Sequence, residues 1–359
     1  MIGNRKDDHV RHAVDQQREG HDSNDFESVA FLHHACAGID YADVALSLEI
    51  TGKPWAAPLF INGMTGGSER TGQINRELAI AARETGLPIA SGSMSAYFAD
   101  DTVADSYRVL RGENPRGFVM ANVNANATVE QVRRAVALLE ADAVQIHLNA
   151  VQEIVMPEGD RSFAGWPRQI ERITQAVEVP VVVKEVGFGL SRRTVRWLRE
   201  AGVAAADVGG RGGTNFARIE NNRRTGADFS FAQGWGQSTV CCLLDVSDLT
   251  GIEILASGGV RSPLDVARAL ALGAKATGVA GHFLRILVDQ GTDALVTTIE
   301  NWLEQLRQLM TVLGARTPDE LLRCDLLLTG DVESFCRLRG IDPMAYSFRS
   351  PDSSVRRHS

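Results

Sequence analysis

The feature that most constrains the fold is an eightfold alternation of short apolar runs with helix-periodic segments. The apolar runs lie at residues 59–62, 88–91, 117–122, 143–148, 180–184, 204–208, 253–257 and 276–280. The segments between them, such as TGQINRELAIAARETG and SPLDVARALALG, begin at Ser or Thr and end at Gly, as helix caps require. Strand and helix repeated eight times predict a parallel sheet, and near-continuous apolar strands indicate that both faces are covered. We therefore predict an α/β fold, a closed (β/α)8 TIM barrel over residues 56–290.

The segments outside the barrel differ in character. Residues 1–55 are expected to form an N-terminal arm, largely helical, that covers the active site. Residues 291–340 are predicted to form C-terminal helices over 293–313, 318–328 and 332–339, because apolar residues recur there at steps of three and four. These helices would pack on the barrel or form a subunit contact. Residues 341–359 form a polar tail that we expect to be disordered.

Composition excludes several classes of function. An apolar content of 44% with 23% charged residues is ordinary for a soluble globular protein. The net charge of −8 argues against nucleic-acid or anionic-membrane binding, so an anionic substrate would need a local cationic pocket. We expect no transmembrane helix and no signal peptide, since the chain has no long apolar run. Five cysteines without a CxxC pair indicate reduced thiols and a cytoplasmic protein.

Polar side chains follow the fourth predicted strand in quick succession. Alternation along residues 143–148 places Gln145, His147 and Asn149 on one face, and Gln152 and Glu153 follow in the turn. An imidazole, amides and a carboxylate at the exit of a buried strand are costly unless something binds there. In an eightfold barrel this strand end lies on the catalytic face.

Glycine-rich segments follow the last three predicted strands, at 209–213, 258–259 and 281. Loops in these positions of a barrel commonly bind phosphate through backbone N–H groups and a helix N-terminus. Thr214 can add a hydroxyl group. The sequence therefore predicts a phosphate-bearing ligand at this end of the barrel.

Lys184 ends the fifth predicted strand, where a solvated lysine is rare. It could act as a Schiff-base nucleophile, or as a permanent cation beside an electron-rich ring. The phosphate loops and the lack of a paired catalytic acid near it favour the second role. A cation there would stabilise the anionic form of a reduced flavin.

A cationic cluster marks the N-terminal arm, at Arg5, Lys6, His9, Arg11 and His12. Such a cluster could cap an anion site. A solvated basic helix end interleaved with Asp7 and Asp8 remains the alternative.

From Arg5 to about Arg339 the chain resembles the type 2, flavin-dependent isopentenyl diphosphate isomerases. The stretches that carry the resemblance are RKDDH at 5–9, MTGG at 64–67, GSMSA at 92–96, QIHLN at 145–149 with Gln152 and Glu153, PEGDR at 157–161, VKEVG at 183–187, GRGGT at 210–214 and SGGVR at 257–261. Two positions depart from the pattern: Gly209, where serine is common, and His282.

The resemblance implies an isomerase that interconverts isopentenyl and dimethylallyl diphosphate, with FMN, Mg²⁺, and NADPH or NADH as the reductant of the flavin. It also implies a homo-oligomer, a tetramer or octamer. The FMN-binding residues it implies are Met64, Thr65, Gly66, Ser93, Asn122, Lys184, Thr214, Gly258, Gly259, Arg261, Ala280 and Gly281. Substrate would be bound by Arg5, Lys6, His9, His147, Asn149 and Gln152. Glu153 would hold the metal, and the catalytic residues would be Gln152, His147 and Lys184.

The reaction would be a 1,3-allylic proton shift, which protonates an alkene and removes a proton from a neighbouring carbon atom. The cationic intermediate needs an electron-rich neighbour in a water-excluded site. The strand ends show no pair of free carboxylic acids, so our hypothesis is that reduced FMN serves as the acid and base without net redox change. Mg²⁺ would neutralise the diphosphate oxygens.

Two other functions remain open at this stage. An FMN-dependent 2-hydroxy acid oxidoreductase would need a catalytic histidine and an arginine near the last strands, where His282 with Arg285 is the candidate pair. A flavin-free aldolase using Lys184, or a non-catalytic phosphate-binding protein, is the third.

Overall fold

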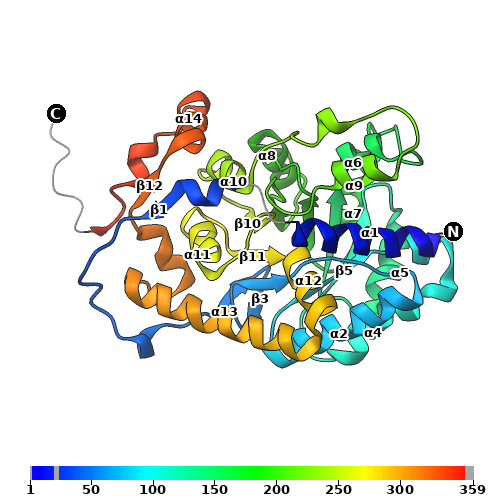
Figure 1. Ribbon diagram of the computed structural model, residues 1–359, viewed down its shortest axis with the longest axis horizontal. Coiled ribbons are helices and arrows are strands. Elements are labelled where there is room, and N and C mark those ends of the chain that lie inside the picture. Colours follow the sequence, from blue (N-terminus) through cyan, green and yellow to red (C-terminus); the bar gives the residue numbers. More distant parts are fainter. Residues whose placement is uncertain (1, 20–23, 352–359) are drawn as a thin grey trace.

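The computed structural model describes residues 2–19 and 24–351, except for the side chains of residues 2–5. Eight parallel strands close into a barrel (Figure 1). They are β4 (Leu59–Ile61), β5 (Ile89–Ser93), β6 (Val119–Asn124), β7 (Ala143–Leu148), β8 (Val181–Glu185), β9 (Ala205–Asp207), β10 (Glu253–Ser257) and β11 (Ala276–Val279). The barrel closes where β11 pairs with β4, with Thr277 opposite Leu59. Every strand overlaps its predicted apolar run, so the predicted TIM barrel is confirmed.

Helices follow the strands and cover the outside of the barrel. They are α2 (Glu69–Thr85), α4 (Asp105–Glu113), α5 (Val129–Leu139), α7 (Trp166–Ala176), α8 (Arg192–Glu200), α10 (Thr239–Val246), α11 (Pro263–Ala271) and α12 (Gly281–Gln290). Ser68, Ser191 and Ser262 each accept a backbone hydrogen bond in the first turn that follows them, as the cap signals predict. Three short helices, α3 (Ser95–Ala99), α6 (Ala150–Val155) and α9 (Phe216–Arg223), lie in the loops after β5, β7 and β9.

A hairpin closes the N-terminal end of the barrel. Its strands, β2 (Leu48–Ile50) and β3 (Lys53–Trp55), bring Ile50 and Trp55 onto an interior layer to which every barrel strand contributes one residue. That layer consists of Phe60, Ala90, Met120, Ala143, Val182, Ala205, Leu255 and Ala276. The Trp55 ring lies 5.6 Å from the Phe60 ring, edge to face. This packed end leaves only the opposite, C-terminal end of the barrel for a ligand.

Among the described residues of the N-terminal arm, α1 (Ile2–Arg18) is the one α-helix, and η1 (Asp25–Ser28) and η2 (Tyr41–Asp43) are short 3-10 helices. After η1, strand β1 (Val29–Phe31) pairs antiparallel with β12 (Leu326–Leu328), and η2 follows. The predicted helix over 318–328 is therefore wrong: these residues form the 3-10 helix η5 (Pro318–Arg323) and then β12. A strand partner about 300 positions away explains the difference, because local periodicity cannot reveal it.

Helices α13 (Thr292–Leu313) and α14 (Gly330–Arg339) agree with the prediction. Beyond them, residues 341–351 of the predicted tail are packed. They include η6 (Pro343–Tyr346), and Asp325 Oδ1 accepts from the backbone N–H of Ser350 at 2.8 Å. Residues 352–359, also assigned to the tail, lie outside the described residues. None of the described helices is both long and apolar enough to cross a membrane.

The packing of the β2–β3 hairpin into the N-terminal end of the barrel, here called the hairpin plug, gives a stability prediction. Trp55→Ala should lower the free energy of unfolding by about 3–5 kcal/mol, because it removes a buried aromatic side chain and leaves a cavity. Chemical denaturation would measure the change. Lys53→Ala, in the same strand but exposed, is the control and should change the free energy by less than about 0.5 kcal/mol. Equal effects of the two substitutions would contradict the plug.

Candidate active site

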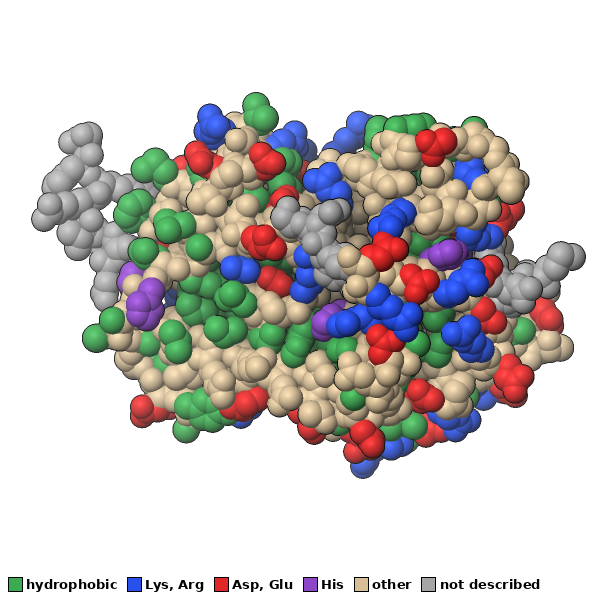
Figure 2. All heavy atoms as spheres, in the orientation of Figure 1, with side chains coloured by type: hydrophobic (Ala, Val, Ile, Leu, Met, Phe, Trp, Pro, Cys, Tyr) green, Lys and Arg blue, Asp and Glu red, His purple; other side chains and the backbone are tan. Residues whose placement is uncertain are grey.

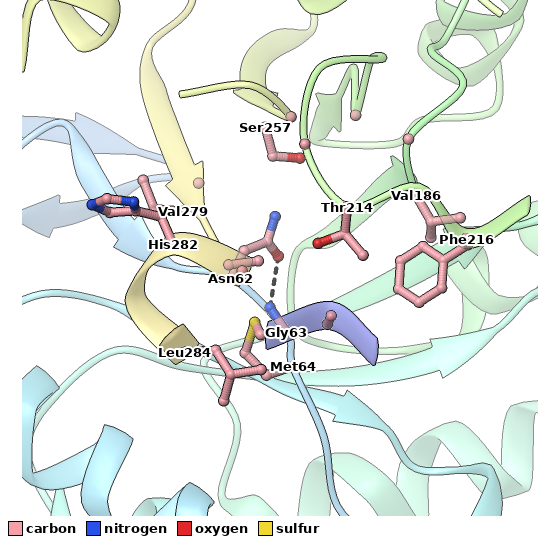
Figure 3. A pocket seen from close by; sticks show the side chains of 18 of the residues that line it. Asn62, Gly63, Met64, Val186, Thr214, Phe216, Ser257, Val279, His282 and Leu284 are labelled. Carbon is pink, nitrogen blue, oxygen red and sulfur yellow. Dashed lines mark hydrogen bonds between the residues drawn. The ribbon is translucent and has the colours of Figure 1, made fainter. Parts of the chain in front are cut away.

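A cavity opens at the C-terminal ends of β4, β8, β9, β10 and β11, bounded by α1 and the start of α12. Its empty volume is about 1030 Å³ including the open mouth. Figure 3 shows Asn62, Met64, Thr214 and Ser257 around this space. The packed barrel thus places its one open end where the glycine-rich segments lie.

Backbone forms one side of the cavity. Gly258 has φ = +94°, and a Cβ there would lie 2.0 Å from the carbonyl oxygen of Gly210, so the loops after β9 and β10 can only approach this closely as glycine. A Cβ on Gly281 would lie 2.8 Å from Thr214 Oγ1, which places this hydroxyl beside the N-terminus of α12. N–H groups at a helix N-terminus with an adjacent hydroxyl are suited to a phosphate group.

Most of the residues predicted to bind the cofactor line this cavity: Met64, Thr65, Lys184, Thr214, Gly258, Gly259, Arg261, Ala280 and Gly281. Arg261 holds the loop by donating to the carbonyl oxygen of Gly212 at 3.0 Å. Three predicted residues are not among the lining residues. Gly66 packs against the ring of Tyr107, Ser93 lies beside Ser95 with their hydroxyl oxygens 2.9 Å apart, and Asn122 is buried in contact with His147.

Lys184 is buried at the end of β8, and its Nζ donates to the carbonyl oxygen of Glu185 at 2.8 Å. Burial lowers the pKa of Lys184, and the charges of Asp207 and Glu185 oppose this shift. Burial raises the pKa of the neighbouring Glu185 to about 7. The backbone N–H groups of residues 187–189 and the positive charge of Lys184 act against this shift, because they favour the carboxylate form. Glu185 therefore fixes the turn after β8, and Lys184 faces the cavity.

His147 is 8% exposed, and its Nδ1 lies 2.7 Å from Asn122 Oδ1. Burial lowers its pKa to about 3, and the positive charges of Lys184 and Lys6 act in the same direction. A hydrogen bond with the backbone carbonyl of Val123 opposes the shift. The imidazole is therefore neutral near pH 7 when no anion is bound beside it.

Gln152, His9 and Glu220 meet at the same end of the barrel. Gln152 Nε2 donates to Glu220 Oε1 at 2.8 Å, and His9 Nε2 lies 3.0 Å from the same oxygen. Burial would raise the pKa of Glu220, but its hydrogen bonds to His9 and Gln152 and the charge of Arg223 hold the pKa below its ordinary value. A buried carboxylate thus joins α1, α6 and α9.

Comparison with known proteins decides the family. Residues 101–327 match the FMN-dependent dehydrogenase family. An isopentenyl-diphosphate delta-isomerase of Nocardia farcinica is 69% identical over 350 residues, which cover 98% of this chain and 97% of that protein. The enzyme of the same name from Kitasatospora griseola is 61% identical over 98% of this chain and 96% of that protein. The chain belongs to the isopentenyl-diphosphate delta-isomerase family. This confirms the type 2 resemblance found in the sequence.

More distant structures share the fold of this isomerase-family chain. A crystal structure of mandelate oxidase superposes with a TM-score of 0.60 at 19% identity, covering 88% of this chain and 90% of that one. At this identity the likeness shows the barrel alone. Of the His282 and Arg285 pair that an oxidoreductase would need, His282 is among the lining residues of the cavity and Arg285 is not. The His282 ring stacks on Trp302 at 5.3 Å, and Figure 3 shows it directed away from Thr214.

Glu153, predicted to hold the metal, lies next to Gln152 on α6. Its Oε1 accepts from Asn149 Nδ2 at 2.8 Å and its Oε2 from the backbone N–H of Asp160 at 2.7 Å. Within the described part of this isomerase-family chain, no group of three or more His, Cys, Asp or Glu residues could hold a metal ion. A metal here would therefore take one carboxylate, waters and substrate oxygens as ligands, an arrangement suited to Mg²⁺.

Helix α1 brings the predicted cationic residues to the cavity. Lys6 and His9 line it, and Lys6 Nζ lies 3.5 Å from the carbonyl oxygen of Ser93. The side chain of Arg5 lies outside the described residues. Acidic and basic side chains intermingle on the outer face where α1 lies (Figure 2), and Arg11 pairs there with Asp8 at 2.8 Å. The predicted cluster therefore divides into an inner part at the cavity and a solvated outer part.

Sequence reasoning missed Glu220 in this site. The sequence indicated no pair of free carboxylic acids at the strand ends, and Glu220 was not among the predicted site residues. Glu220 lies in α9, far from any predicted strand end, within the polar segment ENNRR, so nothing in the local sequence indicates burial. A carboxylate three and four residues from two arginines is usually solvated.

His147 predicts a specific dependence of stability on pH. Its pKa falls from 6.5 to about 3 on folding, so the unfolded chain binds more protons between these values. The free energy of unfolding should therefore fall as the pH drops from about 6.5 toward 3. His147→Gln should weaken this decline, measured as the melting temperature from about pH 7.5 to 5. The control is His33→Gln, an exposed position. Parallel curves for wild type and His147→Gln would contradict the burial of a neutral imidazole.

Proposed function

We propose that this protein interconverts isopentenyl and dimethylallyl diphosphate with reduced FMN and Mg²⁺. The observation that carries the proposal is a cavity lined by a backbone phosphate cradle, Lys184, Lys6 and His9. The polar residues of β7 and α6 adjoin it, because Gln152 and His9 both contact Glu220 Oε1. Identity of 69% to a protein named isopentenyl-diphosphate delta-isomerase supports the reaction. The family match to FMN-dependent dehydrogenases supports the cofactor.

The residues present fit an FMN. Its phosphate would be held by Thr214, Gly258, Gly259 and the N-terminus of α12. Thr65 Oγ1 is buried and has no hydrogen-bond partner among the described residues, so it is available to the ring system. When bound, reduced FMN supplies an electron-rich ring with a nitrogen that can give and take a proton. Lys184 would stabilise negative charge on that ring, because burial strengthens its electrostatic interactions.

The substrate diphosphate would lie at the opposite side, toward β7 and α1. Lys6 supplies a cation, while Asn149 and His147 supply a neutral donor and an imidazole. Glu153 would hold Mg²⁺ on the diphosphate. The metal would neutralise part of the diphosphate charge and so reduce its repulsion by the net negative charge of the protein.

Gln152 would lie beside the reacting carbons in a fixed orientation. Its Nε2 is engaged by Glu220 at 2.8 Å, and its Oε1 accepts from Asn149 Nδ2 at 3.3 Å. Both ends of the amide are therefore held before substrate binds, which lowers the entropic cost of positioning.

Helix α1 would exclude water from the reaction. Val10 and Ala13 are buried and line the cavity. Gln16 fixes the helix to the loop after β9 by exchanging two hydrogen bonds with the backbone of Asn215, at 3.1 and 2.9 Å. A site shielded in this way keeps a cationic intermediate from being trapped by water.

NADPH or NADH would reduce the flavin, and we place the protein in the cytoplasm as a homo-oligomer. The lack of a cysteine pair motif and the net charge of −8 support an intracellular small-molecule enzyme.

An anaerobic assay tests the proposed function. Isopentenyl diphosphate should be converted to dimethylallyl diphosphate only when FMN, Mg²⁺ and NADPH are all present, and removal of any one should abolish turnover. NADPH should be consumed in proportion to enzyme, not to product, because the flavin returns to its reduced state. Bound FMN with no allylic product would refute the isomerase, and turnover of 2-hydroxy acids would then support the oxidoreductase.

The backbone cradle predicts the effect of one methyl group. Gly258→Ala should weaken FMN binding by at least tenfold, measured by flavin fluorescence titration, since its Cβ would collide with the Gly210 carbonyl. Gly273→Ala is the matched control: Gly273 also has a positive φ, +109°, but nothing lies within 4 Å of a Cβ there. It should bind FMN normally despite a similar backbone strain. Equal loss in both variants would mean that general destabilisation, and not the cradle, is responsible.

A further inference from the structure

A chain of hydrogen-bonded polar side chains crosses the inside of the barrel and ends at His147. Asn62 Nδ2 donates to Asp207 Oδ2 at 3.0 Å, and Gln145 Nε2 donates to Asn62 Oδ1 at 3.2 Å. Asn122 Nδ2 donates to Gln145 Oε1 at 2.5 Å, and Asn122 Oδ1 lies 2.7 Å from His147 Nδ1. All five side chains are buried, and Gln145 and Asp207 are fully so. Buried polar chains of this kind persist only when every member is satisfied.

The donor–acceptor direction of these hydrogen bonds is fixed at the Asp207 end, where the partner groups can only donate or only accept. The backbone N–H of Gly63 can only donate, and it lies 2.8 Å from Asn62 Oδ1. Asp207 accepts from Ser257 Oγ at 2.8 Å and from the N–H of Gly209 at 3.2 Å, as a carboxylate does. Asn62 must therefore present its oxygen to Gly63 and its NH₂ group to Asp207.

The remaining orientations follow one after another. Because the Asn62 oxygen faces Gln145, Gln145 must present its NH₂ group there and its oxygen to Asn122. Asn122 must then turn its NH₂ group to Gln145 and its oxygen to His147. An amide oxygen can only accept, so His147 Nδ1 must carry a proton.

We propose that Gln145 is a positioning residue. Its amide sets the donor–acceptor orientation of Asn122, which fixes the proton of neutral His147 on Nδ1 and leaves a lone pair on Nε2. Gln145 is fully buried, so it acts through Asn122 and not by contact with ligands.

This arrangement has a consequence for the diphosphate, which rests on the proposed function. An anionic oxygen can only accept, so His147 can bind it through Nε2 only after taking up a second proton. The charged groups that act on the ring are Lys184 from β8 and Lys6 from α1, and both oppose that proton in the free protein. From β6, the amide of Asn122 contacts the ring, and Asn124 is the register partner of His147. The negative charge of a bound diphosphate reverses the balance, so binding is coupled to proton uptake.

The tautomer can be measured directly by ¹⁵N NMR on protein labelled at histidine, with His147→Gln to assign the signal. Without substrate, wild type should show a proton on Nδ1 and a lone pair on Nε2. Gln145→Met keeps the approximate shape but removes both hydrogen bonds, so His147 should become a mixture of tautomers. Gln145→Glu should retain the Nδ1 proton, because a carboxyl group still accepts from Asn122 and, when protonated, donates to Asn62.

This pair of variants separates positioning from structure. A merely structural role for Gln145 predicts that the apolar, similarly shaped Met is tolerated better than a buried Glu. The proposed role predicts the opposite order for the His147 tautomer. A wild-type signal with the proton on Nε2 would overturn the proposal, and this result needs no variant to fold.

Calorimetry tests the consequence for binding. Inorganic diphosphate with Mg²⁺ is titrated into the protein in two buffers of different ionisation enthalpy, and the protons taken up are compared with those of His147→Gln. Wild type and Gln145→Glu should each take up about one proton per site more than His147→Gln does. In Gln145→Met this difference should be clearly smaller. No excess in wild type would refute the coupling. Since neither measurement requires turnover, a failed isomerase assay with the expected tautomer would refute only the proposed function.

Discussion

The structure depends on the closure of eight parallel strands into one ring of backbone hydrogen bonds. Because β11 pairs with β4, no strand of the barrel is left with an unpaired edge, and all eight strands end at the same mouth. The β2–β3 hairpin fills the other end with Ile50 and Trp55. Residues far apart in the chain, such as Asn62 and Ser257, therefore meet around one cavity.

The two sides of the cavity are built by different means. The phosphate side is backbone held against backbone, where the Gly258 and Gly210 segments approach too closely for any side chain. The proposed substrate side, next to the cavity, is made of side chains, His147, Gln152 and Glu220 among them, each held by a hydrogen bond before a ligand arrives. Backbone amides suit a permanent cofactor, whereas oriented side chains suit a substrate whose charge distribution changes during reaction.

The chain segments outside the barrel complete the site. Helix α1 lies against the mouth and is fixed there by the hydrogen bonds of Gln16 to Asn215. Next in the chain, β1 pairs with β12, so the arm and the C-terminal region brace each other beside the barrel (Figure 1). Cavity and cover are thus tied to one framework, which favours a site whose groups are oriented in advance.

The sequence alone determined the barrel, most helix starts and the family, because each depends on local patterns. Apolar runs, cap residues and motifs such as QIHLN and GRGGT are contiguous in the chain. Only the tertiary structure decided that Glu220 joins Gln152 and His9, that β12 is a strand, and that Asn62 contacts Asp207 across 145 positions. These features are set by partners distant in sequence, and burial turns an ordinary polar residue into an oriented one. Periodicity reports which face of an element is buried, but it cannot report which side chain from another strand will meet that face.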